Sequence, residues 1–81
     1  MITTTQVKSA ILIILSDKAK YSTSLNYAVN YCRHALQIAT ATDLSTQCNY
    51  ILGNIAGWRH PSAKSVRSTL KQYVKENNYE S

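Results

Sequence analysis

Apolar residues recur in four segments of the chain at the three- and four-residue spacing of an amphipathic helix. The first segment follows three threonines at positions 3–5, which offer N-cap hydroxyls, and it continues to about Asp17. Leu12 and Ile13 fall outside its apolar stripe, so this helix is apolar over more of its circumference than one small core needs. The predicted inward side consists of Val7, Ala10, Ile11, Ile14 and Leu15.

Two explanations fit the extra apolar residues of this first helix. The simpler one is a central helix that neighbouring helices enclose on nearly every side. The other is an interface for a partner or a second copy of the chain, because contiguous exposed apolar area usually marks one. Leu12 and Ile13 would then lie at the seam of a dimer or of a complex.

The second segment predicts a helix over 25–39, with Tyr27 and Tyr31 on its flank. The third predicts a helix over 44–56, capped by Thr42 or Asp43, in which Gly53 would permit the close approach of a neighbouring helix or ring. The predicted inner side of the second helix is Leu25, Ala28, Val29, Cys32, Leu36 and Ala39. That of the third is Leu44, Cys48, Ile51, Leu52 and Ile55.

The fourth segment follows a stop at Gly57 and a short corner at residues 58–60, and it predicts a helix over 61–76. Pro61 suits the first turn, where its missing N–H would be unpaired in any case. The predicted buried stripe is Ala63, Val66, Leu70, Tyr73 and Val74. The remaining residues, 77–81, are expected to fray.

These elements predict one all-α domain over residues 1–81, a compact bundle of four short helices. Two glycines and one proline leave few turn signals, which favours long helices over short strands. A hydrophobic fraction of 44% with 16% charged residues is typical of a folded globular chain and excludes a disordered tail.

The net charge of +5 is concentrated in the second half of the chain. No Asp or Glu lies between Asp43 and Glu76, whereas five Lys or Arg residues do. Such a balance suits an acidic partner, which could be nucleic acid, an anionic membrane surface or an acidic protein segment.

Four of these cations share one side of the predicted fourth helix. At about 100° per residue they fall within roughly 80° of one another, beside the apolar stripe. They are Lys64, Arg67, Lys71 and Lys75, and Arg59 could join them from the corner. A charged outer face is also what any solvated helix shows. Because no acids are interspersed, we predict that these five residues bind a partner.

Trp58 and His60, in the corner, are possible anchors for that partner. A lone tryptophan in a small domain is usually its largest packing element, so a core role competes with the anchor role. The corner and the basic helix also resemble a helix-turn-helix, but the residues at the start of that helix are merely permissive for reading bases: Ser62, Lys64, Ser65 and Arg67. For single-strand binding, the candidate stacking rings are Trp58 and Tyr73.

The residue types that carry catalysis or bind metals do not form a recognisable site in the sequence. Cys32 and His34 are two residues apart on a helix and point in different directions, and no CxxC or HxxxH pair occurs with Cys48 or His60. Both cysteines lie on apolar stripes, where a thiol is inert. We therefore expect no enzyme activity, no cofactor and no metal.

The sequence also suggests a compartment. Two cysteines are fewer than the disulfide frameworks of small secreted domains contain, which favours a reducing environment. The longest apolar run, residues 10–15, is far shorter than the roughly 20 residues that span a bilayer. With no basic leader at the N-terminus, we expect a cytoplasmic protein without a transmembrane segment.

Two strings, LNYAVNYCRHAL and QCNYILGNIAGWRHPSAKSVRSTLK, carry a resemblance that covers most of residues 21–74. They resemble the small lysis-inhibition accessory proteins, or cytoplasmic co-antiholins, of T-even-type bacteriophages. The resemblance implies a protein of the host cytoplasm that binds the cytoplasmic segment of the phage holin. Such binding would support the antiholin in delaying lysis. It transfers no binding residue, so the predicted binding residues come from the helix pattern alone.

Three hypotheses follow from these patterns. The first is a non-catalytic protein-binding module that acts through the fourth helix and its preceding corner, as a phage lysis-inhibition regulator. The second is a small basic regulator that binds nucleic acid with the same residues. The third is a self-associating structural protein that forms a homodimer through the first helix.

Overall fold

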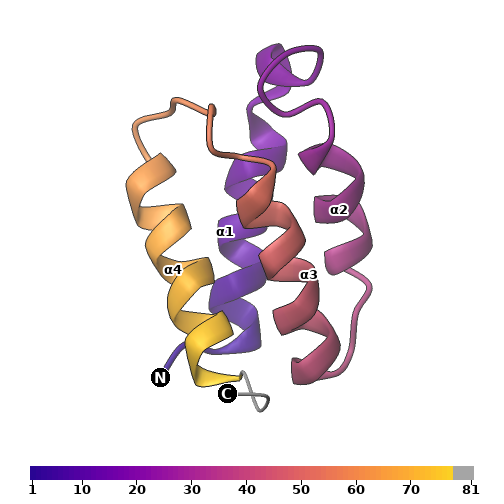
Figure 1. Cartoon of the computed structure of the whole chain (residues 1–81), viewed down its shortest axis with the longest axis vertical. Coiled ribbons are helices and arrows are strands. Elements are labelled where there is room, and N and C mark those ends of the chain that lie inside the picture. The colour runs from indigo at the N-terminus through magenta and orange to yellow at the C-terminus, as the bar shows by residue number, and fades with distance from the viewer. Residues whose placement is uncertain (78–81) are drawn as a thin grey trace.

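The computed structural model describes residues 1–77, and within them four helices stand side by side in an elongated bundle (Figure 1). Helix α1 packs against α2 and α4, and α3 packs against the same two, so α2 and α4 lie diagonally opposite each other. The prediction of an all-α bundle is confirmed. The helices are α1 (Thr4–Ser16), α2 (Ala28–Ala35), α3 (Ala41–Gly53) and α4 (Ala63–Glu76), with a 3₁₀ turn η1 (Lys18–Lys20) after α1.

Side-chain caps fix the first turns of α1 and α3. The Thr3 hydroxyl accepts from the Gln6 backbone N–H at 3.1 Å, and Gln6 Oε1 accepts from the Thr3 N–H at 2.7 Å, which forms a capping box. In α3 the Thr40 hydroxyl accepts from the Asp43 N–H at 3.3 Å. The predicted cap at Thr42 or Asp43 is therefore wrong, because the helix begins earlier, at Ala41, where the chain leaves the extended conformation of Thr40.

The core lies along the axis of the bundle and receives one face of every helix. Trp58 is the largest of its fully buried side chains. The predicted stripes of α1 and α4 reach this core, with Leu15 and Val74 half-buried against it. The largest other fully buried residues are Ile11, Ile14, Leu25, Leu44, Ile51, Ile55 and Leu70.

The second helix is shorter than the pattern predicts. Its α-helical part ends at Ala35. Two hydrogen bonds of the 3₁₀ type, which join residues three positions apart, close the last turn: Gln37 N–H donates to the His34 carbonyl and Ile38 N–H to the Ala35 carbonyl. Ala35 is fully buried, whereas Ala39, which was predicted to be inward, lies exposed in the connection. Leu25 is buried as predicted, although it precedes the α-helix.

The connection between α3 and α4 is also longer than predicted. Helix α3 ends at Gly53 instead of residues 56–57, because the Asn54 side chain donates to the Tyr50 carbonyl at 2.7 Å and its backbone N–H donates to Ile51. Pro61 precedes α4 in a turn instead of occupying its first helical position. Residues 54–62 exceed the three or four residues of a helix-turn-helix corner, so that geometry is absent from this segment.

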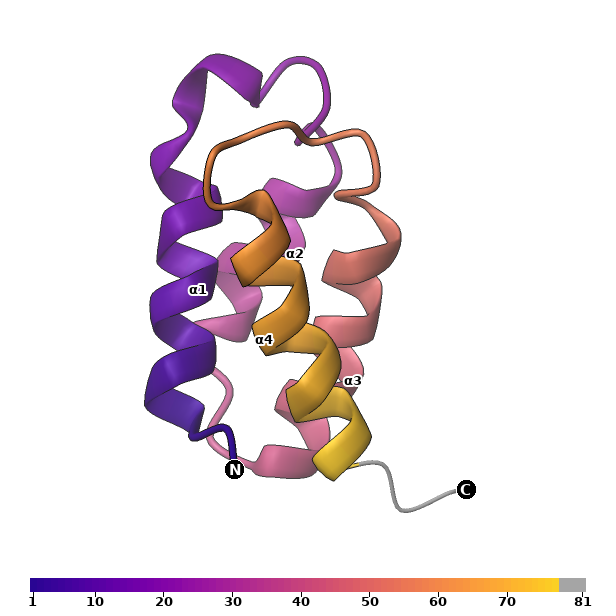
Figure 2. The same cartoon turned by 90° about the vertical axis from the view of Figure 1, so that its left-hand side faces the viewer.

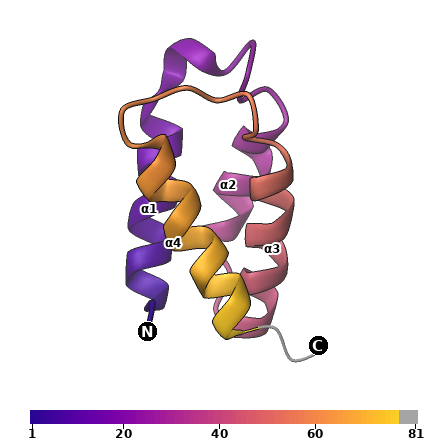
Figure 3. The same ribbon diagram turned by 60° about the vertical axis from the view of Figure 1, so that its left-hand side comes forward.

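Two further predictions require correction. Gly53 permits no close approach, since a Cβ added there would meet nothing within 4 Å. Helix α1 is not enclosed by its neighbours, because its outer side faces solvent where Leu12 is 54% and Ile13 36% exposed (Figures 2 and 3). Fraying was predicted for residues 77–81, of which 78–81 lie outside the described residues. Asn77 caps α4 through its N–H and the carbonyls of Tyr73 and Val74.

Candidate binding site

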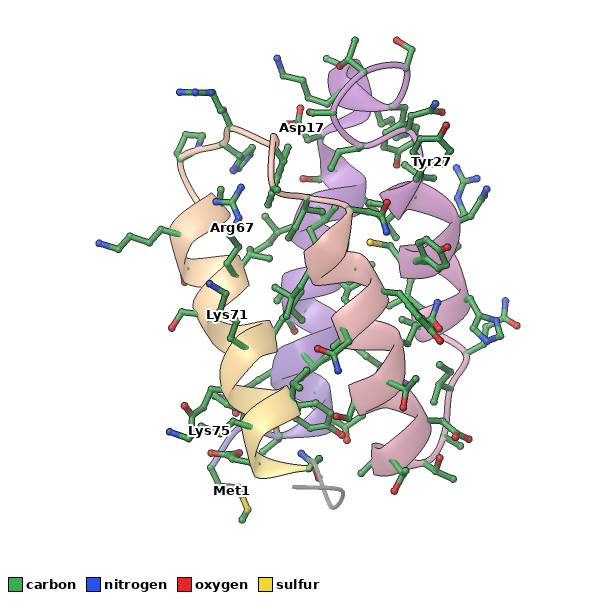
Figure 4. All side chains as sticks on the ribbon, in the orientation of Figure 1. Met1, Asp17, Tyr27, Arg67, Lys71 and Lys75 are labelled. Atoms are coloured by element: carbon green, nitrogen blue, oxygen red, sulfur yellow. The ribbon has the colours of Figure 1, made fainter. Side chains whose placement is uncertain are left out.

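Basic side chains of α4 line one open groove of about 430 Å³. Lys64, Lys71 and Lys75 are exposed along it, and we call these three residues the cationic row. Figure 4 shows Lys71 and Lys75 following Arg67 along the helix. At a rise of about 1.5 Å per residue, the row extends roughly 16 Å along the axis. Ser68 and Gln72 complete the lining, which includes no carboxylate among the described residues.

Arg67 lines the same groove, but its guanidinium is bound to the protein itself. Its Nη2 atom donates to the backbone carbonyl of Ile55 at 2.8 Å and to that of Trp58 at 2.7 Å, with a longer contact of 3.5 Å to Ala56. These carbonyls belong to the connection before α4. Arg67 therefore fixes that connection against the helix, whereas the three lysines extend into solvent.

The other predicted residues, Trp58, Arg59 and His60 of the corner, do not line this groove. Trp58 is only 1% exposed, so it occupies the core and its ring is not presented to a partner. The His60 ring stacks on the indole with a centroid distance of 5.2 Å and an interplanar angle of 22°, and its Nδ1 atom accepts from the Ser62 N–H at 3.0 Å. Arg59 is exposed.

Asp17 holds Trp58 in place from the far end of α1. The indole N–H donates to Asp17 Oδ2 at 2.8 Å, across 41 positions of sequence. A buried indole N–H needs such an acceptor, since leaving it unpaired costs about 1–3 kcal/mol. Sequence reasoning missed this pair, because Asp17 has the position expected of a helix-end acid.

Glu76, the acid that follows the cationic row, is directed to the N-terminal segment. Its Oε1 accepts from the Ile2 backbone N–H at 2.8 Å and its Oε2 from the Gln72 side-chain amide at 3.0 Å. The bond from Gln72, then that from Ile2, and to a smaller extent the charge of the N-terminal amine lower the pKa of Glu76 below its ordinary 4.5.

The two cysteines lie in the core as free thiols. Burial raises the pKa of both to about 12, and for Cys32 the charge of a neighbouring Cys48 thiolate would add to the effect. Both are therefore protonated at neutral pH. Within residues 1–77, no group of three or more His, Cys, Asp or Glu side chains could hold a metal ion.

Tyrosines form a second exposed surface, on α2 and α3. Tyr27 is 72% and Tyr50 53% exposed, and the rings of Tyr31 and Tyr50 stack at a centroid distance of 5.6 Å. Figure 4 places Tyr27 on the opposite side of the bundle from Lys71. The sequence predicted a flank at Tyr27 and Tyr31, but it did not pair Tyr31 with Tyr50, since that depends on how α2 and α3 meet.

Comparison with models of protein families, with curated proteins and with solved structures gives no match. No helix within residues 1–77 has the length and apolar character needed to cross a membrane. A functional assignment for this chain must therefore be built on its surfaces, and the cationic row is the one with the clearest chemical preference.

Proposed function

We propose that this protein is a non-catalytic binding module whose cationic row captures an acidic segment of a partner protein. The observation that carries the proposal is the grouping of Lys64, Lys71 and Lys75 in one groove whose described lining contains no carboxylate. Exposed lysines add modest affinity individually, but a matching set of carboxylates steers association and fixes register.

The resemblance to lysis-inhibition accessory proteins supplies a partner for this module. We propose that it binds the cytoplasmic segment of a phage holin, in the host cytoplasm, and supports the antiholin in delaying lysis. In this proposal Lys64, Lys71 and Lys75 contact the partner, while Arg67 holds the connection before α4 in position through its carbonyl bonds. Arg59 is exposed but does not line the groove.

Nucleic acid is the competing ligand for a row of lysines. The rings that would have stacked on bases beside the row are Trp58 and Tyr73, and these are only 1% and 2% exposed. The row therefore lacks those stacking partners, which favours a protein ligand. A mobility-shift titration separates the two, because phosphate contacts make affinity fall steeply as salt rises.

The test is a binding titration with a fluorescent peptide of the holin cytoplasmic segment. The variant Lys64→Glu/Lys71→Glu is compared with Lys18→Glu/Lys20→Glu, which changes the net charge equally but lies in η1 and outside the lining of the groove. We expect the first variant to weaken binding by about tenfold or more, which corresponds to about 1.4 kcal/mol, and the second much less.

Three results would contradict this proposal. An equal loss of peptide affinity in both variants would mean that net charge alone attracts the peptide. Unchanged affinity in the α4 variant would remove the row from the interface. A salt-dependent shift of DNA or RNA that the α4 variant abolishes, with no binding of the peptide, would identify nucleic acid as the ligand.

A further inference from the structure

We propose that the partner segment is an amphipathic helix whose apolar side enters a groove between α1 and α4 while its acidic flank meets the cationic row. This inference rests on the proposed function and adds the form and chemistry of the ligand. It depends on a second groove that shares α4 with the row but has the opposite character.

This second groove, the α1–α4 groove, measures about 290 Å³. This volume is just below the roughly 300–1,000 Å³ of sites that hold small molecules, which suits a few side chains of a partner better than a large cofactor. Ala10 and Val66 line this groove and also belong to the buried core. Ile13 supplies the exposed apolar surface of the groove. Hydroxyl and amide side chains complete the lining, which includes no charged residue among those described.

The shape of the lining favours a helix as the occupant. Thr5, Ser9 and Ile13 follow one another at intervals of four residues, so the groove runs along α1 for about 12 Å, or two turns. A docking helix presents its anchors at a similar spacing, in the pattern i, i+3 or i+4, i+7. Ser9 and Ser65 are small, which allows its backbone to come close.

The neighbouring charges specify the other side of that helix. Ser65 and Thr69 line the α1–α4 groove. The residues that precede them, Lys64 and Ser68, line the groove that contains the cationic row. Successive residues are about 100° apart around a helix, so the two grooves adjoin across the outer surface of α4. A ligand that covers both must be uncharged on one side and acidic on the next.

The exposed apolar residues of α1 provide a matched pair for the test. Ile13 lines the α1–α4 groove, whereas Leu12 is more exposed but is not part of the lining. Replacing either by serine removes a similar apolar side chain from the same helix. A further variant, Ser9→Tyr, fills the groove from an exposed position without altering the core.

The probe is a fluorescent 20-residue peptide with leucines along one helical side and glutamates on the adjoining flank. Its control has the same composition in scrambled order. We expect the probe to bind at least about tenfold tighter than the control and to gain helical circular dichroism when bound. Ile13→Ser and Ser9→Tyr should each weaken binding by about five- to tenfold, while Leu12→Ser stays within about twofold.

Circular dichroism of each variant shows that the fold is retained, and Ser9→Tyr keeps the test valid if Ile13→Ser unfolds. Equal binding of the probe and its scrambled control would overturn the inference, as would a probe that binds without becoming helical. If both groove variants bind the probe normally and Lys64→Glu/Lys71→Glu loses affinity, the α1–α4 groove is not the binding site, while the proposed function is unaffected. Sedimentation that shows a dimer abolished by Ile13→Ser, with unchanged probe affinity, would assign the groove to a second copy.

Discussion

Replacing Arg67 by methionine is expected to destabilise the protein, whereas the same replacement at Lys71 is expected to leave stability nearly unchanged. The two residues carry the same charge and lie one turn apart on α4, and methionine suits a helix at either position. They differ in their contacts, since Arg67 donates to the carbonyls of Ile55 and Trp58 while Lys71 extends into solvent.

The magnitude follows from these bonds. A hydrogen bond to a charged group contributes about 1.5–3 kcal/mol where it is shielded from water. Arg67 is half-buried, so water can replace part of each bond in the variant. We therefore expect a total loss of about 1–3 kcal/mol, which for a chain of this size lowers the melting temperature by roughly 5–20 °C. Exposed Lys71 should change stability by no more than about 0.5 kcal/mol.

The assay is thermal unfolding followed by circular dichroism at 222 nm, with urea unfolding as a second measure. Equal melting temperatures for Arg67→Met and Lys71→Met would refute the distinction between a structural arginine and a solvent-exposed lysine. Arg67→Lys should fall between wild type and Arg67→Met, because an ammonium group keeps the charge but ends a shorter side chain, which does not reach the position from which Nη2 bonds both carbonyls.

Three further predictions concern groups outside the cationic row. Asp17→Ala should cost about 1–3 kcal/mol in urea unfolding monitored by Trp58 fluorescence, and Asp17→Asn clearly less, because asparagine keeps an acceptor for the indole. Cys32 and Cys48 should resist a thiol reagent at pH 8 and react fully in denaturant; rapid labelling of the native protein would contradict their burial and raised pKa. Glu76 has a lowered pKa, so it stabilises the fold at neutral pH. Its advantage over Glu76→Gln should shrink as pH falls below 4.5, and a constant difference in melting temperature would contradict this.

Helical periodicity was sufficient to predict the fold class and the buried stripes of α1 and α4, because one face of each helix must enter the core. It was less reliable at the helix ends. The end of α3 depends on the Asn54 side chain bonding to the Tyr50 carbonyl, and the early end of α2 exposes Ala39. Such ends are decided by single side-chain bonds and turns, to which an apolar pattern is insensitive.

The candidate site was predictable only as far as it lies on one helix. The lysines of α4 share a side because of the helical repeat, so their grouping followed from spacing alone. The same spacing placed Arg67 with them, although its carbonyl partners lie in a connection whose path the pattern does not determine. The surplus apolar character at Leu12 and Ile13 was a valid signal of an exposed face. Only Ile13 of these two residues lines a groove, and this depends on how α1 packs against α4, which the pattern does not determine.

The α1–α4 groove is held by polar contacts near both ends of the helix pair. Near one end, Asp17, which caps α1, accepts from Trp58 in the segment that leads into α4. Near the other end, Glu76 of α4 accepts a hydrogen bond from the Ile2 N–H. One turn earlier on α4, the Tyr73 hydroxyl lies 3.4 Å from the Thr4 hydroxyl of α1. A groove held in this way is formed before the ligand arrives, so binding should lose little entropy in ordering it. The second contact uses Glu76, whose pKa is lowered, so protonation of Glu76 as the pH falls below 4.5 should loosen that end of the groove and weaken binding of the helical peptide.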